Sequence, residues 1–133
     1  MATKLFKHAF ILLLVIATLD ILGEVFYLYW SIWWFDTLLH FLSGICVTMG
    51  GISVYFYIFK NLTPDTTKII LIGLAWIVFI GVIWEIFELY FGITFLSDGI
   101  TYIRDTSSDL LMDIIGGLVG SLYASKTLKN NGQ

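Results

Sequence analysis

Four long apolar segments dominate the sequence and limit the folds that it can adopt. They cover approximately residues 8–30, 36–59, 68–93 and 107–125. Each is close to the ~20 residues that a helix needs to cross the hydrocarbon core of a membrane. Backbone polar groups in lipid must be hydrogen-bonded within their own segment, so we expect helices rather than strands. The sequence therefore predicts an all-α membrane protein, a four-transmembrane-helix bundle that forms a single domain over residues 1–133.

The composition agrees with a membrane-embedded chain. Hydrophobic residues make up 59% of the chain and charged residues only 13%, whereas soluble domains carry about a quarter charged residues. The net charge of −3 and the lack of a basic cluster argue against a nucleic-acid partner. The single cysteine, Cys46, cannot form an internal disulfide, and we expect it to serve in packing.

The positive charges predict the orientation of the spans. If the chain crosses the membrane four times, Arg104 lies on one side and all the lysines lie on the other, namely Lys4, Lys7, Lys60, Lys68, Lys126 and Lys129. Both termini and the connector 60–68 are then cytoplasmic, and the connectors 30–35 and 92–104 are external. The alternative, a cleaved signal peptide in the first segment, is disfavoured because that segment carries Asp20 and Glu24 and has no clear cleavage site.

The connectors carry their own signals. The aromatic segment 30–35 is typical of a turn at the water–lipid interface. In the connector 60–68, Thr63-Pro64-Asp65 predicts a helix start with Thr63 as the N-cap. The connector 92–104 is longer, and it is expected to hold a short strand or an interfacial turn.

Most of the acidic residues lie within the predicted spans or at their ends. These eight are Asp20, Glu24, Asp36, Glu85, Glu88, Asp105, Asp109 and Asp113. Most are spaced three or four residues from another acid or from His40, which places each pair on one helix face. With the predicted topology all eight fall in the outer half of the membrane. Because a charge that faces lipid is costly, we expect them to face inward as one cluster, and we expect the cytoplasmic halves of the spans to be apolar throughout.

Small residues continue the acidic faces. Gly44 follows His40 by four residues, Gly81 precedes Glu85 by four, and Gly116 and Gly120 follow the aspartates of the last span. Such glycines allow membrane helices to approach closely. The acidic faces are therefore predicted to be the packing faces as well.

The charges in this cluster do not balance, which points to a bound cation or to protonated acids. The nearby protein cations are Arg104 and, if protonated, His40, and carboxylates in a low-dielectric site cannot all remain ionised without partners. Carboxylates with one imidazole suit a divalent ion such as Mg²⁺, Mn²⁺, Ca²⁺ or Zn²⁺. The predicted metal ligands are Asp36, His40, Glu85, Glu88, Asp105, Asp109 and Asp113, with Asp20 and Glu24 as additional pocket residues.

Taken singly, several of these residues have simpler explanations. Asp36 and Asp105 stand at predicted helix starts, where a carboxylate caps backbone amides. Asp20, Glu24 or Asp36 can pair with a neighbouring polar side chain, and His40 can be a hydrogen-bonded histidine of the interior.

Three motifs resemble a known group of proteins. The segments "FDTLLHFLSG" (35–44), "WEIFELYF" (84–91) and "DTSSDLLMDIIGGLVG" (105–120) resemble the VanZ-like group of small bacterial membrane proteins, and especially the related YjdF-type family. The resemblance assigns an Asp–His pair to the first motif and a pair of acids to each of the other two. It also implies that Arg104 matches the arginine before the last motif. Thr37 replaces the usual lysine and Asp113 the usual asparagine, while Asp20 and Glu24 have no counterpart.

The resemblance covers the second to fourth predicted spans. It implies where the protein is located but not which chemistry it performs. It implies a multi-pass protein of the cell membrane, the inner membrane of a bacterium or archaeon. The VanZ group is associated with glycopeptide (teicoplanin) resistance, but the likeness implies no particular reaction.

Three functions follow as hypotheses. The first is a metal-assisted enzyme with His40 or Glu88 as general base and with Arg104 binding the phosphate of a lipid-linked or other phosphate-bearing substrate. The second is a proton- or cation-coupled transporter, since intramembrane acids often mark such pathways. The third is a structural subunit whose acids are satisfied internally, without a cation. Membrane lipids are the expected partners, and the sequence leaves homo-oligomerisation open.

Overall fold

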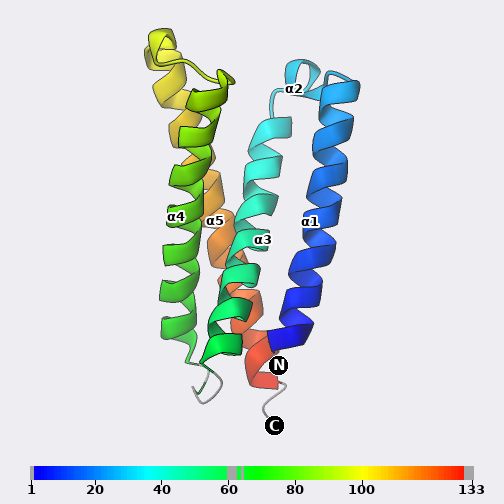
Figure 1. The fold of residues 1–133 in the computed structure, drawn as a ribbon, viewed down its shortest axis with the longest axis vertical. Helices are drawn as coiled ribbons and strands as arrows, with labels where there is room; N and C mark the ends of the chain where they lie inside the picture. The colour runs from blue at the N-terminus through cyan, green and yellow to red at the C-terminus, as the bar shows by residue number, and fades with distance from the viewer. Residues whose placement is uncertain (1, 60–62, 64, 131–133) are drawn as a thin grey trace.

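The chain folds as a bundle of long helices. The computed structural model describes residues 2–59, 63 and 65–130, and every regular element in this part of the chain is helical. Helices α1 (Ala2–Val25), α3 (Phe35–Ile58), α4 (Thr66–Phe91) and α5 (Ile100–Asn130) run side by side (Figure 1). The short helices α2 (Leu28–Ser31) and η1 (Leu96–Asp98) lie at one end of the bundle, named here the loop end. The start of α1 and the end of α5 lie at the other, the terminal end.

Helix α3 is the centre of the packing. It contacts α1 on one side and α4 and α5 on the other, and α5 also packs along α4. Helix α1 contacts mainly α3 and stands at the edge of the bundle (Figure 1). In the most apolar 18-residue stretch of α1 only 11% of the residues are buried, whereas in the corresponding stretch of α3 39% are buried. Helix α1 therefore leaves most of its apolar surface uncovered by the rest of the chain, as suits a helix surrounded by lipid.

Glycines set the distance between α3 and α5. A Cβ atom added to Gly44 would collide with the backbone carbonyl of Asp113, and one added to Gly116 would collide with that of Phe41. A Cβ atom on Gly120 would stand 2.8 Å from the carbonyl oxygen of Ile45. The two backbones thus touch directly, and the close packing predicted from the glycine spacing is confirmed.

The apolar core occupies the terminal half of the bundle. Its buried members are Leu5, Ala9, Met49, Ile52, Ile69, Ala124 and Leu128. Cys46 is buried next to it, and its thiol donates a hydrogen bond to the backbone carbonyl of Ala9 at 3.3 Å. The packing role predicted for Cys46 is therefore confirmed, and this bond ties α1 to α3.

Two predicted helix boundaries are wrong. The segment 8–30 is not one helix, because α1 ends at Val25 and Tyr27 adopts a left-handed conformation (φ 56°) before α2 begins. Helix α4 begins at Thr66 with Asp65, not Thr63, as its N-cap, and the Asp65 carboxylate accepts a hydrogen bond of 3.0 Å from the backbone amide of Lys68. Pro64 lies outside the described residues.

The start of the last helix also differs from the prediction. The connector after α4 holds η1 rather than a strand, and α5 begins at Ile100, directly after Gly99, whose φ is positive (58°). Asp105 therefore lies inside α5, and the idea that it caps the helix is wrong. Asp36 lies in the first turn of α3, whose N-cap is Trp34.

In the part of the chain that the structure describes, three helices are long and apolar enough to cross a membrane by length and composition. They are Thr3–Val25, Phe35–Ile58 and Thr66–Phe91. Helix α5 is longer than any of them but carries Arg104 and three aspartates in its first half. The structure thus supports a protein with several membrane spans. The halves of the helices near the terminal end are the ones predicted to be cytoplasmic and apolar throughout. That expectation is wrong, because Thr48, Ser121 and Ser125 are buried there.

The glycine contacts lead to a stability prediction. Gly44→Ala and Gly116→Ala should each lower the free energy of unfolding by about 1–3 kcal/mol, because a methyl group forced against a backbone carbonyl separates α3 from α5. The measurement is the melting temperature of the detergent-solubilised protein. Gly50→Ala is the matched control, since nothing lies within 4 Å of its added Cβ. Equal melting temperatures for all three variants would contradict the proposed close contact.

Candidate metal centre

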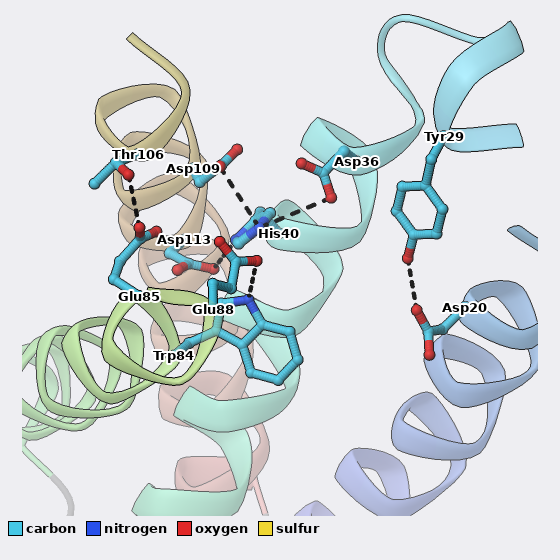
Figure 2. A network of polar contacts seen from close by, with 10 residues as sticks. All are labelled: Asp20, Tyr29, Asp36, His40, Trp84, Glu85, Glu88, Thr106, Asp109 and Asp113. Atoms are coloured by element: carbon cyan, nitrogen blue, oxygen red, sulfur yellow. Dashed lines mark hydrogen bonds and ion pairs between the residues drawn. The ribbon is translucent and has the colours of Figure 1, made fainter. Parts of the chain in front are cut away.

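A histidine surrounded by carboxylates lies between α3 and α5. Asp36 and His40 are one turn apart on α3, and Asp109 and Asp113 are one turn apart on α5. Nε2 of His40 lies 3.9 Å from Oδ1 of Asp36 and 3.8 Å from Oδ2 of Asp109. Its Nδ1 lies 3.5 Å from Oδ1 of Asp113. Figure 2 shows the imidazole enclosed by these three carboxylates.

Helix α4 adds two glutamates to this group. Glu85 is buried, and its Oε2 accepts a hydrogen bond of 2.7 Å from the Thr106 hydroxyl of α5. Glu88 is half-buried, and its Oε1 accepts a bond of 2.9 Å from the indole N–H of Trp84. Glu88 follows Glu85 by three residues on α4, which places both side chains on one helix face. The acidic cluster therefore consists of Asp36, His40, Glu85, Glu88, Asp109 and Asp113, drawn together in Figure 2.

Gly81 lets α4 come close to this cluster. A Cβ atom on Gly81 would stand 3.2 Å from Oδ2 of Asp113. The glycine predicted to continue the Glu85 face thus leaves room for an aspartate of the neighbouring helix.

The acidic cluster has more negative than positive groups. It contains five carboxyl groups and one imidazole, and in the described part of the chain no lysine or arginine forms an ion pair with it. Buried carboxylates without a counter-ion are unfavourable and either take up protons or bind a cation. The cluster therefore offers a place for a cation.

The donor atoms of three residues are close enough to share one ion. One donor atom each from Asp36, His40 and Asp109 can be chosen so that all lie within 4.8 Å of one another. Ligand atoms around one Mg²⁺ or Zn²⁺ ion are about 3–4 Å apart, given metal–ligand distances of about 2.0–2.2 Å. A small inward movement of the side chains would thus bring all three into range.

The position of Asp113 suits such a site. Histidine ligands usually donate their second ring N–H to a carboxylate or carbonyl, which fixes the ring and its tautomer. Asp113 stands at Nδ1 of His40, while Nε2 faces Asp36 and Asp109. The arrangement fits a metal ligand oriented by a neighbouring aspartate.

Other predicted site residues do not join the cluster. Asp20, Glu24, Asp105 and Arg104 are exposed on the surface of the bundle. Asp20 of α1 instead accepts a hydrogen bond of 2.6 Å from the Tyr29 hydroxyl, apart from the cluster in Figure 2. Burial and this bond raise the pKa of Tyr29, so its hydroxyl stays protonated as the donor. The simpler explanation for Asp20, pairing with a polar neighbour, is confirmed.

The side chains that donate hydrogen bonds to these acids were not predicted from the sequence. Thr106 lies three residues before Asp109, and Trp84 lies four residues before Glu88. Both spacings place the donor on the same helix face as an acid and were visible in the sequence. Tyr29, which donates to Asp20 outside the cluster, had no such signal in the sequence, because the turn between α1 and α3 brings the two residues together.

The bond between Thr106 and Glu85 leads to a second stability prediction. Thr106→Val should destabilise the protein by about 1–3 kcal/mol, because the substitution leaves a buried carboxyl group without its donor. Thermal unfolding in detergent measures this. Thr101→Val makes the same chemical change at an exposed position of α5 and should have little effect. If the two variants melt alike, the bond does not contribute to stability.

Comparisons with known proteins agree with a membrane protein. A family model described as "Predicted membrane protein (DUF2238)" matches residues 2–130. No curated protein and no solved structure matches the chain. The likeness to the VanZ-like and YjdF-type families is a finer statement than this match supports, and it stays a prediction. The match spans the four long helices and every residue of the acidic cluster. The chain therefore belongs to this family of predicted membrane proteins.

Proposed function

We propose that this protein binds a divalent metal ion at the acidic cluster and uses it near the outer face of a cell membrane. One observation carries the proposal: five carboxyl groups and a single histidine gather inside a helix bundle, and no lysine or arginine of the described chain pairs with them. A divalent cation would compensate this charge where water is scarce.

The proposal includes a fourth span and an orientation. Helix α5 runs along α3 and α4 (Figure 1), and its Asp109 and Asp113 are buried between helices instead of facing lipid. Lysines gather at the terminal end, at Lys4, Lys7, Lys68, Lys126 and Lys129. Lys60 belongs to the same group in the sequence but lies outside the described residues. The excess of lysine supports a cytoplasmic terminal end and an external loop end.

Asp36, Nε2 of His40 and Asp109 are the proposed ligands. Asp113 would accept the Nδ1 proton and leave the Nε2 lone pair for the metal. Three protein ligands leave positions for water or a substrate, as in catalytic metal sites. Oxygen donors with one imidazole suit Mg²⁺, Mn²⁺, Ca²⁺ or Zn²⁺.

A phosphate-bearing lipid headgroup is the proposed substrate class. Arg104 is exposed at the loop end, five residues before Asp109 on α5 and therefore about 7–8 Å from it along the helix axis. A guanidinium group at this height can bind a phosphate while the metal binds another of its oxygens. Glu88 is a better candidate than His40 for the general base, because both ring nitrogens of His40 already face carboxylates.

Metal binding is the first test. Purified wild-type protein in detergent should bind Mn²⁺ stoichiometrically, as measured by equilibrium dialysis and by the electron paramagnetic resonance signal of free Mn²⁺. His40→Ala and Asp109→Asn should abolish binding, and Asp113→Asn should weaken it about 10–100-fold, because it leaves the ligand set intact but removes the group that orients His40. Affinity should fall as the pH is lowered, since protons compete with the metal for the ligands.

Carboxylates outside the cluster are the matched controls. Asp20→Asn and Glu24→Gln remove charge from α1 without touching the proposed ligands and should bind Mn²⁺ like the wild type. A folded wild-type protein that binds none of Mg²⁺, Mn²⁺, Ca²⁺ or Zn²⁺ would rule out the metal and leave internally protonated acids, as in a structural subunit.

The role of Arg104 is tested with the metal-loaded protein. Glycerol phosphate, a minimal lipid headgroup, should alter the spectrum of bound Mn²⁺, and Arg104→Ala should weaken its binding about tenfold or more through loss of a charged hydrogen bond. Lys126→Ala, at the opposite end of α5, should have no effect. A spectrum insensitive to glycerol phosphate would exclude this substrate class while leaving the metal site intact.

A further inference from the structure

A row of polar and small residues continues from the acidic cluster toward the terminal end. It repeats every four residues along α5, as Asp105, Asp109, Asp113, Gly117, Ser121, Ser125 and Lys129. Residues four apart form a ridge that winds slowly around a helix. From Asp109 to Ser125 every member of this ridge is buried. Polar groups therefore extend through the interior of the bundle well beyond the acidic cluster.

The middle of this row contains two hydroxyl groups without partners. Thr48 of α3 and Ser121 of α5 are both 0% exposed, and neither hydroxyl has a hydrogen-bond partner among the described residues. Leaving such a group unpaired costs roughly 1–3 kcal/mol. Folded proteins usually satisfy buried polar groups of this kind with ordered internal water. These two hydroxyls thus point to a ligand that is small and polar.

Gly73 and Gly117 lie next to these two hydroxyl groups. Oγ1 of Thr48 stands 3.0 Å from the position of a Cβ atom on Gly117. A Cβ atom on Gly73 would stand 2.6 Å from Cγ2 of Thr48 and would collide with Oγ of Ser121. Thr48 and Ser121 therefore meet next to the bare backbone of α4, where α3, α4 and α5 come together.

The row reaches the surface at the terminal end. The hydroxyls of Ser125 and Thr66 are hydrogen-bonded at 2.9 Å, and Nζ of Lys129 donates to the Thr66 hydroxyl at 2.5 Å. Ser125 is buried, Thr66 is half-buried and Lys129 is exposed. The three side chains thus connect the interior of the bundle to its surroundings.

The spacing of the row suits bridging water. Four residues rise about 6 Å along a helix, and one water molecule with hydrogen bonds of about 2.8 Å on each side spans nearly that distance. We propose that Thr48, Ser121 and Ser125 hold a chain of internal water molecules between the acidic cluster and Thr66, and that protons move along this chain. Each water forms one new O–H bond to the incoming proton and breaks another O–H bond to release a proton to its neighbour, so the number of O–H bonds is unchanged and one proton is transferred along the chain.

This proposal goes beyond the metal site and does not depend on it. The hydroxyls and water molecules relay protons without titrating themselves, and Thr48, Ser121 and Ser125 are not among the proposed metal ligands. Ser53 offers a contrast, because it is also a buried hydroxyl of α3 but donates to the carbonyl of Met49 in its own helix at 2.7 Å. A satisfied hydroxyl of this kind indicates no internal water.

Proton flux in liposomes tests the proposal. The full-length protein is reconstituted into vesicles that contain a pH-sensitive dye, and a potassium gradient with valinomycin provides the driving potential. Wild-type vesicles should take up protons faster than protein-free vesicles. The double variant Thr48→Val/Ser121→Ala should reduce the uptake to the protein-free rate, because both hydroxyls are removed with little change in shape.

Two controls separate loss of the path from loss of the fold. Ser53→Ala removes a buried hydroxyl outside the row and should conduct like the wild type, as should Thr48→Ser, which keeps its hydroxyl. Melting temperatures are compared for all variants, and the single variant Ser121→Ala decides the question if the double variant unfolds. Wild-type uptake at the protein-free rate, or uptake unchanged when the hydroxyls are removed, would overturn the proposal.

Discussion

The direct contact between the backbones of α3 and α5 is the constraint on which the rest of the structure depends. Lipid is as apolar as the helices themselves, so helices associate in a membrane through close packing and polar contacts rather than through expulsion of water. Gly44 and Gly116 allow carbonyl groups of the facing helix to approach where a side chain would stand. The same contact brings His40 within reach of Asp109 and Asp113. The acidic cluster therefore exists because these two helices touch.

The two ends of the bundle bury different polar groups, and these groups need different partners. The loop end holds buried carboxyl groups, whose charge needs protons or a cation. The terminal half combines an apolar core with the unpaired hydroxyls of Thr48 and Ser121, which need only a neutral hydrogen-bonding partner such as water. The proposed metal ion and the proposed water chain would satisfy these two regions separately, and each can be present without the other.

The acidic cluster contains fewer residues than the sequence pattern predicted. Spacing shows that Asp20 and Glu24 share one face of α1, but it does not show where that face points. Helix α1 packs mainly on α3, at the edge of the bundle, and both acids are exposed. Asp105 shares a ridge with Asp109, yet the ridge winds around α5, so Asp105 leaves the interior one turn above the cluster.

The sequence by itself predicted the helical class, four spans of which three are candidate spans in the described structure, the glycine faces and every member of the acidic cluster, because hydropathy and residue spacing act along one helix. Only the tertiary structure decided that α1 lies at the edge of the bundle and that Tyr29 pairs with Asp20. It also decided that Thr106 of α5 forms a hydrogen bond with Glu85 of α4. It also showed that Thr48 and Ser121 are buried without partners. These features depend on the rotation and closeness of neighbouring helices, and no pattern within a single helix records them.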